Sequence, residues 1–360
     1  MERALRRPYR TLKKLATSYP KLVPLEECFE INKINARPAY RVRIPDVLSM
    51  TLKEDAAYLR NQTYIVPEDY SVILNDALVS LEYNVILNRS RDIVVESTNA
   101  GKPSFFPRKV IDPRQRSYIA GYSVLLHSRF SNYYHLLVDE LPRLIALQQP
   151  PFGDLEEIRL LSSRTLTEVE MFYLDKLGMS NMQVICLDKD RHYYVENLIF
   201  TTYKTRWQSG YIPEDYVACL RDRLVPKRPR RGTRVFISRE KARRRVIRNR
   251  GELIAMLSEK GFQSVVLEDL SPQEQIETLY DADVVVGTHG AGLSNILFSP
   301  AGLRVIEIFP TPYVVPHYFF LSKALGHDYT YQCGDDLLNG RTYEVNVEEL
   351  GRSLARLGIA

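Results

Sequence analysis

The amino-acid sequence predicts an α/β protein with two domains and a β-rich region near its N-terminus. Its length of 360 residues exceeds what a single hydrophobic core usually supports. Residues 37–120 alternate β-branched and polar residues between short turn signals, which is typical of β-strands. From residue 122 onward, strand-like apolar runs alternate with helical segments, which indicates an α/β fold.

The first predicted domain covers residues 1–224. Its β-rich part contains strands expected at residues 71–74, 77–87 and 92–96. Its α/β part begins with a strand at residues 123–127 and a helix over residues 131–149, which Pro142 is expected either to kink or to break after Leu141. The remaining elements are strands at residues 158–161, 182–187 and 197–201 and helices at residues 165–177 and 213–224.

Residues 225–234 contain two prolines, a glycine and a charge run, which predict a linker between domains. The second predicted domain, residues 235–345, alternates short apolar strands with helices, one of which has a capping box at Ser271. This pattern predicts a parallel, Rossmann-like sheet. The sequence of residues 346–360 predicts a C-terminal helix. Packing of this helix back onto the first domain is one arrangement that we consider.

The charge distribution suggests a specific anionic partner. Residues 221–250 contain 14 Lys and Arg against Asp222 and Glu240, although the net charge of the whole chain is only +5. Nucleic-acid binding would require aromatic residues within the basic run, and this run contains only Phe236. We therefore expect no nucleic-acid partner.

The cysteines and the N-terminus favour a cytoplasmic protein. The four cysteines are scattered without the paired spacing of a zinc or redox motif. No apolar run approaches the roughly 20 residues of a membrane span, and the basic N-terminus is not typical of a secretory signal. Residues 1–20 predict either a basic amphipathic helix that contacts the inner face of the cell membrane or a solvated terminus.

A first candidate constellation lies in the predicted helix after residue 131. His135 and Asp139 are four residues apart, so a helix presents them on one face. Such a pair can serve as a general base with an orienting partner, as two of three metal ligands, or as an ordinary surface pair. The neighbouring sequence supplies no third ligand.

A second constellation follows the strand predicted at residues 234–238, where the chain enters a cationic loop. Ligands of open α/β sheets bind at the carboxyl ends of the strands. Arg239 is the best candidate for a bidentate phosphate contact, with Lys241 and Arg245 as supporting charges. The alternative is a solvated charge run.

The third constellation is the glycine-rich turn within residues 283–295, which leaves the apolar strand 284–286 and enters a predicted helix at Ser294. Backbone N–H groups at a helix N-terminus are suited to phosphate, although the glycines alone also fit close packing. His289 within this turn favours a binding role. Glu307 on the next strand is interpreted either as a ribose ligand or as a partner of the basic loop.

Familiar nucleotide and hydrolase motifs do not fit the sequence. The glycines at 290 and 292 lack the third glycine of the dinucleotide fingerprint, because that position is Asn295. The chain contains neither a P-loop Gly-Lys-Ser/Thr nor a G-x-S-x-G nucleophile motif.

Taken in order, these motifs resemble those of family 61 glycosyltransferases, which include bacterial capsule and exopolysaccharide enzymes, plant xylosyl- and arabinosyltransferases and animal protein O-GlcNAc transferases. The resemblance covers about residues 122–309. It is carried by Asn132-Tyr-Tyr-His135-x-x-x-Asp139, by Ser238-Arg239 with Arg244 and Arg245, by Gly287-x-His289-Gly290-Ala291-Gly292-Leu293-x-Asn295, and by Glu307.

The resemblance implies a GT-B architecture, in which two Rossmann-like domains face each other across a cleft. It implies an inverting transfer from a nucleotide-sugar, expected to be UDP-linked, to a glycan or glycolipid acceptor in capsule or exopolysaccharide synthesis. No metal or cofactor is expected. Asp139 is the expected base, with His135 orienting it or exchanging roles with it. Expected on the acceptor side are Asn132, Tyr134 and Arg143, and on the donor side Ser238, Arg239, Lys241, Arg245, Thr288, His289, Gly290, Ala291, Gly292, Leu293, Asn295 and Glu307.

A non-catalytic nucleotide- or polyanion-binding module is the alternative function. The sequence leaves open the sugar, its nucleotide, the acceptor, the linkage and the oligomeric state.

Overall fold

The computed structural model describes residues 21–44, 62–98, 116–128, 130, 132–155, 157–189, 191–205, 210–242, 244–310, 315–336 and 342–359. The basic helix predicted for residues 1–20 lies outside them. The chain forms two compact units, one of residues up to 39 with 67–207 and one of residues 40–66 with 208–360. None of the described helices is both long and apolar enough to cross a membrane.

The first unit is built on a nine-stranded mixed sheet in the order β1-β7-β6-β5-β11-β8-β9-β10, with β2 also paired to β5. Its strands are β1 (Leu22–Val23), β2 (Ile34–Arg37), β5 (Asp69–Ser80), β6 (Val85–Leu87), β7 (Ile93–Val94), β8 (Arg116–Leu125), β9 (Ile158–Ser162), β10 (Val184–Cys186) and β11 (His192–Thr201). Its helices are η2 (Leu25–Glu27), η4 (Val95–Ser97), α2 (Tyr133–His135), η6 (Leu136–Glu140), α3 (Leu141–Ile145), η7 (Ala146–Gln148), η8 (Phe152–Asp154) and α4 (Glu168–Lys176).

The centre of this sheet is the long antiparallel pair β5–β11, which is flanked on one side by parallel strands. Val72, Leu74 and Leu198 belong to the apolar cluster that holds this pair together. Strands β8, β9 and β10 are parallel, and helical segments connect each of them to the next. The β-rich start and the α/β continuation predicted from the sequence are both confirmed.

The helical segment after β8 contains a π-helical turn. Helical residues run without a break from Tyr133 to Gln148, and η6 has the π form immediately before Pro142. Proline cannot donate a backbone hydrogen bond and crowds the preceding turn. The wider π turn accommodates this restriction without ending the helix.

The second unit contains a five-stranded, fully parallel sheet in the order β14-β12-β15-β16-β17. Its strands are β3 (Tyr40–Ile44), β4 (Gln62–Val66), β12 (Thr233–Ile237), β13 (Val246–Ile247), β14 (Phe262–Val265), β15 (Ala282–Thr288), β16 (Arg304–Phe309), β17 (Asp328–Cys333), β18 (Asp335–Asp336) and β19 (Thr342–Glu344). Its helices are α5 (Glu214–Leu224), α6 (Arg250–Glu259), η9 (Leu267–Asp269), α7 (Pro272–Tyr280), η10 (Ala291–Phe298), α8 (His317–Ala324) and α9 (Val347–Arg356).

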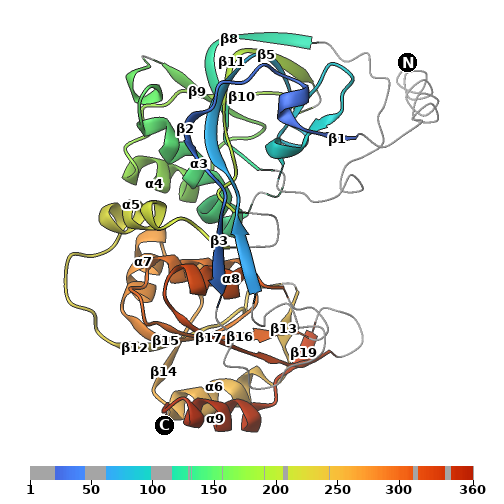
Figure 1. The fold of residues 1–360 in the computed structure, drawn as a ribbon. Coiled ribbons are helices and arrows are strands. Elements are labelled where there is room, and N and C mark those ends of the chain that lie inside the picture. The colour runs from blue at the N-terminus through green and yellow to red at the C-terminus, as the bar shows by residue number, and fades with distance from the viewer. Residues whose placement is uncertain are drawn as a thin grey trace, which may run out of the picture. The chain divides into compact units, whose positions relative to one another are not determined.

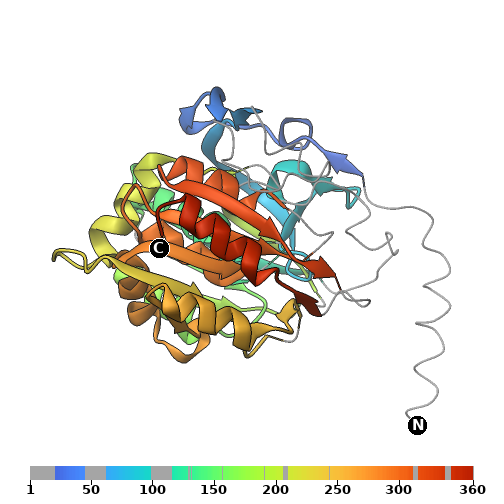
Figure 2. The ribbon, with the colours of Figure 1, turned by 90° about the horizontal axis from the view of Figure 1, so that it is seen from below.

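Helices cover both faces of the parallel sheet. Figure 1 shows α7 and α8 on one side of the strands and α6 and α9 on the other, and Figure 2 shows α6 and α9 next to each other. Leu253 of α6 and Leu350 of α9 pack with Val284 and Ile306 of the sheet in one core cluster. The parallel α/β pattern predicted for this part of the chain is confirmed. The capping box at Ser271 is also present.

The strand order of this sheet reverses between β12 and β15. Strand β12 comes first along the chain, the connection to β14 runs to one side, and β15, β16 and β17 follow on the other side. The carboxyl ends of the two strands at such a reversal leave a crevice in which α/β sheets bind ligands.

The division into units differs from the sequence-predicted boundary at residues 225–234. Tyr64 of the β3–β4 hairpin packs on Phe320 of α8, so this hairpin belongs to the second unit. Helix α5 also belongs there, because Arg221 donates to the carbonyl oxygen of Leu297. The C-terminal helix α9 packs against α6 of the second unit.

Candidate functional site

The cationic loop and the glycine-rich turn meet at the point where the strand order reverses. Ile237 at the end of β12 pairs with Gly287 near the end of β15. The next residues along each chain segment are Ser238-Arg239 and Thr288-His289-Gly290. The structure therefore brings together two motifs that lie about 50 residues apart in the sequence, at the edge expected for ligands.

The guanidinium of Arg239 lies directly against the backbone of Gly290. A Cβ atom added to Gly290 would lie 1.6 Å from Nη1 of Arg239, a distance that no real contact allows. The φ of Gly290 is 171°, which is ordinary extended backbone. Glycine is therefore required here by the close approach of the arginine and not by the backbone conformation.

Arg245 reaches the same turn from the end of the cationic loop. Its Nη1 donates to the carbonyl oxygen of His289 at 3.0 Å. Its backbone has a φ of +59°, a left-handed conformation that costs energy for a residue with a side chain. Burial and the charge of Arg245 both lower the pKa of Arg239, whose Nε is buried without a hydrogen-bond partner among the described residues. Two neighbouring guanidinium groups, one of which has a buried donor without a partner among the described residues, suit an anion.

His289 is held from behind by a buried carboxyl group. Its Nδ1 lies 2.5 Å from Oε1 of Glu307, and Oε2 of Glu307 accepts from the hydroxyl of Tyr329 at 2.5 Å. The His289 ring also stacks on Phe309. Glu307 is fully buried, so it lies behind His289 rather than in the position expected of a ribose ligand. The cause is the central place of β16 in the sheet, with β15 on one side and β17 on the other.

Burial favours the neutral form of both partners. It lowers the pKa of His289 to about 3, with help from Arg245 and Arg239, and raises the pKa of Glu307 well above its ordinary value. A protonated Glu307 donates to Nδ1 of His289, which places the remaining imidazole proton on Nε2. His289 is thereby fixed as a neutral hydrogen-bond donor.

The turn enters a 3₁₀-helix earlier than predicted. Element η10 begins at Ala291, because the N–H of Leu293 already donates to the carbonyl oxygen of Gly290. Leu293 packs against Gly287, where a Cβ would lie 2.9 Å from its Cδ2. Asn295 is buried and donates to Gln275 and to the carbonyl oxygen of Gly292, so it fixes the turn.

The other predicted donor-side residues differ in their surroundings. Thr288 is buried, and its Oγ1 has no hydrogen-bond partner among the described residues. Ser238 is also buried, and its hydroxyl donates to Glu240 at 3.4 Å. Lys241 is exposed, and its ammonium group pairs with Asp269 rather than supporting Arg239. Ala291 and Gly292 are half-buried at the start of η10.

Two tyrosines of this site were missed by the sequence reasoning. The hydroxyl of Tyr318 donates to the carbonyl oxygen of Gly290 at 2.6 Å. Tyr343 is fully buried, and its hydroxyl has no hydrogen-bond partner within the described part of the chain. Burial raises its pKa, whereas the charges of Arg239 and Arg245 lower it. Both tyrosines come from elements far along the chain, and no local motif marks them.

Much of the basic segment 221–250 is neutralised by neighbouring carboxylates. Arg228 forms two hydrogen bonds with Asp281 and also lies near Glu277. Other ion pairs of the segment are Lys227–Asp222, Arg230–Asp283, Lys241–Asp269 and Arg250–Glu240. The charge run is therefore largely a set of local pairs, which weakens its interpretation as a polyanion-binding surface.

The first unit contains the predicted His135–Asp139 pair. Nδ1 of His135 lies 2.5 Å from Oδ2 of Asp139, and Oδ1 of Asp139 accepts from Thr205 at 3.2 Å. The side chain of His135 is 18% exposed, whereas that of Asp139 is 4% exposed. The carboxylate thus lies behind the imidazole, an arrangement that orients a histidine for proton transfer.

The predicted acceptor-side residues are largely structural. Asn132 caps α2 by accepting from the backbone N–H groups of Tyr134 and His135, which is typically worth about 1 kcal/mol. Tyr134 is buried against the edge of the His135 ring. Arg143 is also buried and donates to the carbonyl oxygen of Leu125. Its guanidinium therefore binds the backbone, whereas the sequence predicted it beside an acceptor.

Two Asp-x-Asp triplets in the sequence offer carboxylates that a divalent cation could use. In residues 281–283, Asp281 binds Arg228 and Asp283 binds Arg230. In residues 188–190, Asp188 lies near Arg191, and residue 190 is outside the described residues. The first triplet is therefore occupied by arginines rather than arranged around an ion.

Comparison with known proteins agrees with the motif analysis. Residues 133–306 match the sequence model of the family described as Glycosyltransferase 61. A beta-1,2-xylosyltransferase of Oryza sativa subsp. japonica is 28% identical over 219 residues, which are 53% of this chain and 36% of the relative. An alpha-1,3-arabinosyltransferase of the same plant is 30% identical over 166 residues, which are 44% of this chain and 27% of the relative.

This chain spans about a third of the length of these curated relatives. The matched residues contain His135, Asp139, Arg239, Arg245 and the turn around His289, and they end at the strand that carries Glu307. The comparisons support an enzyme of the glycosyltransferase class. The predicted resemblance is confirmed, and the chain is a relative of the family 61 glycosyltransferases.

Proposed function

We propose that this protein transfers a sugar from a nucleotide-sugar donor to a hydroxyl group of a glycan acceptor, with inversion at the anomeric carbon. The observation that carries the proposal is the contact of Arg239 with Gly290 at the reversal point of the parallel sheet. Two arginines, a neutral imidazole donor and a glycine-rich backbone are a suitable set of groups for a diphosphate.

The leaving diphosphate gains negative charge as the bond from the anomeric carbon to its oxygen breaks. Arg239 and Arg245 would stabilise this charge, and Nε2–H of His289 would donate to a phosphate oxygen. Glu307 is then a positioning residue that sets the protonation of His289. In this mechanism the diphosphate needs no divalent cation, because the two arginines supply the positive charge.

The acceptor hydroxyl must lose its proton as its oxygen attacks the anomeric carbon. We assign this step to His135, whose imidazole is partly exposed, with Asp139 holding it and stabilising the imidazolium that forms. The proton passes to Nε2 of His135, and the electron pair of the broken bond leaves with the diphosphate.

The donor and acceptor classes are part of the proposal. The names of the rice relatives describe xylosyl and arabinosyl transfer, which favours a pentose or a related sugar. UDP is the proposed nucleotide, and the acceptor is a glycan or glycolipid used in polysaccharide synthesis. We place this reaction in the cytoplasm, at or near the inner face of the membrane.

A glycine substitution tests the diphosphate site. In Gly290→Ala the new methyl group would displace the Arg239 guanidinium, while the extended backbone at this position accepts alanine. We expect the thermal shift caused by UDP to disappear in Gly290→Ala and in Arg239→Ala. At 100 times Kd, the lost stabilisation is about 2.7 kcal/mol.

Two variants serve as matched controls. Gly251 on α6 has open space around its Cα, so Gly251→Ala should keep the full UDP shift. Arg248→Ala removes an exposed arginine from the same basic segment and should also keep it. A wild-type UDP shift in Gly290→Ala would disprove the site. Nucleotide binding without transfer to any acceptor would favour the non-catalytic module.

A further inference from the structure

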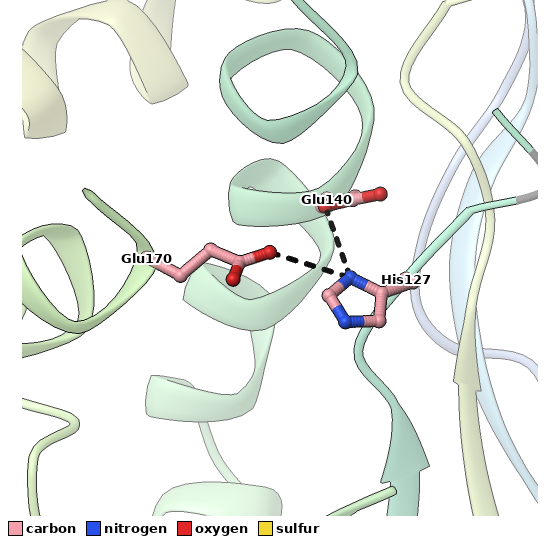
Figure 3. Close-up of side chains that lie close together, drawn as sticks. All are labelled: His127, Glu140 and Glu170. Carbon is pink, nitrogen blue, oxygen red and sulfur yellow. Dashed lines mark ion pairs between the residues drawn. The ribbon is translucent and has the colours of Figure 1, made fainter. Parts of the chain in front are cut away.

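A second buried cluster lies in the first unit and takes no part in the proposed reaction. It consists of His127, Glu140 and Glu170, which are 2%, 0% and 4% exposed (Figure 3). His127 follows β8, Glu140 ends the π-helical turn η6, and Glu170 lies on α4. The sequence reasoning did not identify this cluster, because its members come from three separate elements.

One nitrogen and two carboxylate oxygens converge in this cluster. Nδ1 of His127 lies 3.6 Å from Oε2 of Glu140 and 3.6 Å from Oε1 of Glu170. One ligating atom from each residue lies within 4.8 Å of the other two. Figure 3 shows the imidazole and the Glu170 carboxylate pointing toward each other, with Glu140 above the ring.

The surrounding hydrogen bonds decide which imidazole nitrogen carries a proton. The hydroxyl of Ser162 donates to the carbonyl oxygen of Arg164 at 2.6 Å, so its proton is already used. It can therefore only accept from Nε2 of His127, which lies 3.1 Å away. In neutral His127, the lone pair is then on Nδ1 and faces the two carboxylates.

The carboxylates are also fixed from outside the cluster. The N–H of Ser128 donates to Oε1 of Glu140, which leaves Oε2 directed inward. Arg164 donates to Oε1 of Glu170 at 2.6 Å and to Oε2 at 2.8 Å, and the N–H of Thr167 donates to Oε2. Oε1 therefore has one further lone pair to offer toward His127. Nδ1 of His127 and Oε2 of Glu140 have no hydrogen-bond partner among the described residues, although both are buried.

A buried water, a proton or a cation can satisfy a buried lone pair that faces two carboxylates, and the zinc titration below distinguishes the cation from the other two. A proton on Nδ1 would make an imidazolium, which should draw one carboxylate oxygen to about 2.8 Å. Neither oxygen is that close. A cation between the three atoms removes the repulsion without such a contact, and ligands around a tetrahedral zinc lie about 3.4 Å apart.

We propose that His127, Glu140 and Glu170 bind a structural divalent cation of the zinc class. One imidazole nitrogen with two carboxylate oxygens is a donor set that zinc accepts, and Ser162 supplies the outer hydrogen bond that orients a histidine ligand. The ion joins the end of β8 to α4 and to the helical turn that carries Asp139. It is separate from the proposed diphosphate groups, which belong to the second unit.

The test measures metal binding by the full-length protein. The protein is first treated with a chelator and desalted, and it is then titrated with Zn²⁺. The zinc that the protein retains after the titration is measured by elemental analysis. We expect about one equivalent of Zn²⁺ per chain, and we expect the melting temperature to rise when Zn²⁺ binds. His127→Gln and Glu140→Gln should weaken Zn²⁺ binding at least about 100-fold. Glu168→Gln, an exposed position on the same helix as Glu170, should bind Zn²⁺ as the wild type does.

Co²⁺ provides a second measurement that needs no variant to fold. Co²⁺ bound by the wild-type chain should show the strong visible absorption of a low-coordinate site, and Zn²⁺ should abolish it. Retention of less than about 0.1 equivalent of Zn²⁺, with no thermal shift, would overturn the proposal. Unchanged binding by His127→Gln would overturn it too, because the ion would then be elsewhere. Neither result depends on the UDP site.

Discussion

The protein contains two histidine–carboxylate pairs with the same contact distance and different surroundings. In the first unit, His135 and Asp139 lie 2.5 Å apart within one helical segment. In the second unit, His289 and Glu307 also lie 2.5 Å apart, but they are separated by 18 positions in the sequence. His135 is partly exposed, whereas His289 and its partner are both buried.

This difference separates two chemical roles for one kind of pair. A partly exposed imidazole backed by a carboxylate can accept a proton from a substrate and pass it to water. A buried imidazole whose pKa has fallen to about 3 stays neutral near pH 7, so with Nδ1 bonded to Glu307 it offers a ligand a fixed N–H donor at Nε2. The hydrogen-bond distance alone does not reveal the role; burial and neighbouring charge do.

The largest expected effect is on the His135 pair. Asp139→Asn removes the charge that stabilises protonated His135, so kcat should fall by a factor of about 10² to 10⁴. The UDP thermal shift should not change, because the donor groups are intact. The measurement is the initial rate of transfer at saturating donor. Asp175→Asn, at an exposed position on α4, is the matched control. A wild-type rate in Asp139→Asn would remove this pair from the mechanism.

The second prediction concerns the buried histidines and pH. Burial lowers the pKa of His289 to about 3 and that of His327 to about 4, and Arg221 and Arg230 contribute to the second shift. Unfolded histidine takes up a proton near pH 6.5, so below this pH unfolding binds protons. At these pH values the protonated Glu307 releases a proton on unfolding while His289 takes one up, so this pair contributes no net slope. The free energy of unfolding should therefore fall as pH drops from 6.5 toward 4.5 by about 1.4 kcal/mol per pH unit, through His327.

Urea unfolding at several pH values measures this slope. His327→Gln keeps a donor for the carbonyl oxygen of Ile296 and cannot be protonated. The slope of the unfolding free energy against pH should therefore decrease by the contribution of one proton, about 1.4 kcal/mol per pH unit. An unchanged slope in this variant would show that His327 is not the group that titrates.

The smallest expected effect is on the His289 pair. In Glu307→Gln, the new amide can donate to Nδ1 of His289 and accept from Tyr329, as a protonated carboxyl does. We expect a loss below about 1 kcal/mol in stability, with UDP binding kept. Glu307→Ala removes the hydrogen bonds of the carboxyl group to His289 and Tyr329 and should cost about 2–4 kcal/mol. A Glu307→Gln variant as unstable as Glu307→Ala would show that Glu307 is ionised.

Local sequence was sufficient for elements whose signals lie within a few residues. The capping box at Ser271 and the apolar run of β15 predicted their elements. The strands predicted at residues 71–74 and 77–87 had the wrong bounds, because β5 continues through residues 69–80 and a turn separates it from β6. The motif order also predicted which segments meet, because parallel strands end at one edge of a sheet. The close contact between Arg239 and Gly290 agrees with that prediction.

The partners and burial of individual side chains could not be predicted in the same way. Arg143 is predicted on the acceptor side, but its guanidinium donates to the backbone at the end of β8. Glu307 reads as a ribose ligand, but His289 and Tyr329 occupy its two oxygens. In both cases the partner comes from a distant segment, and the sequence pattern around the residue carries no information about it.

The π-helical turn η6 has a consequence for how this part of the molecule could arise or be lost. Relative to an α-helix, such a turn contains one additional residue. It ends with adjacent carboxylates that serve two different histidines, Asp139 for His135 and Glu140 for His127. Deleting a single residue, such as Val138, would restore a regular helix and rotate one of the two carboxylates away from its partner. Losing the π turn would therefore leave only one of the two histidine–carboxylate contacts in place, so this turn is what allows one helical segment to carry both.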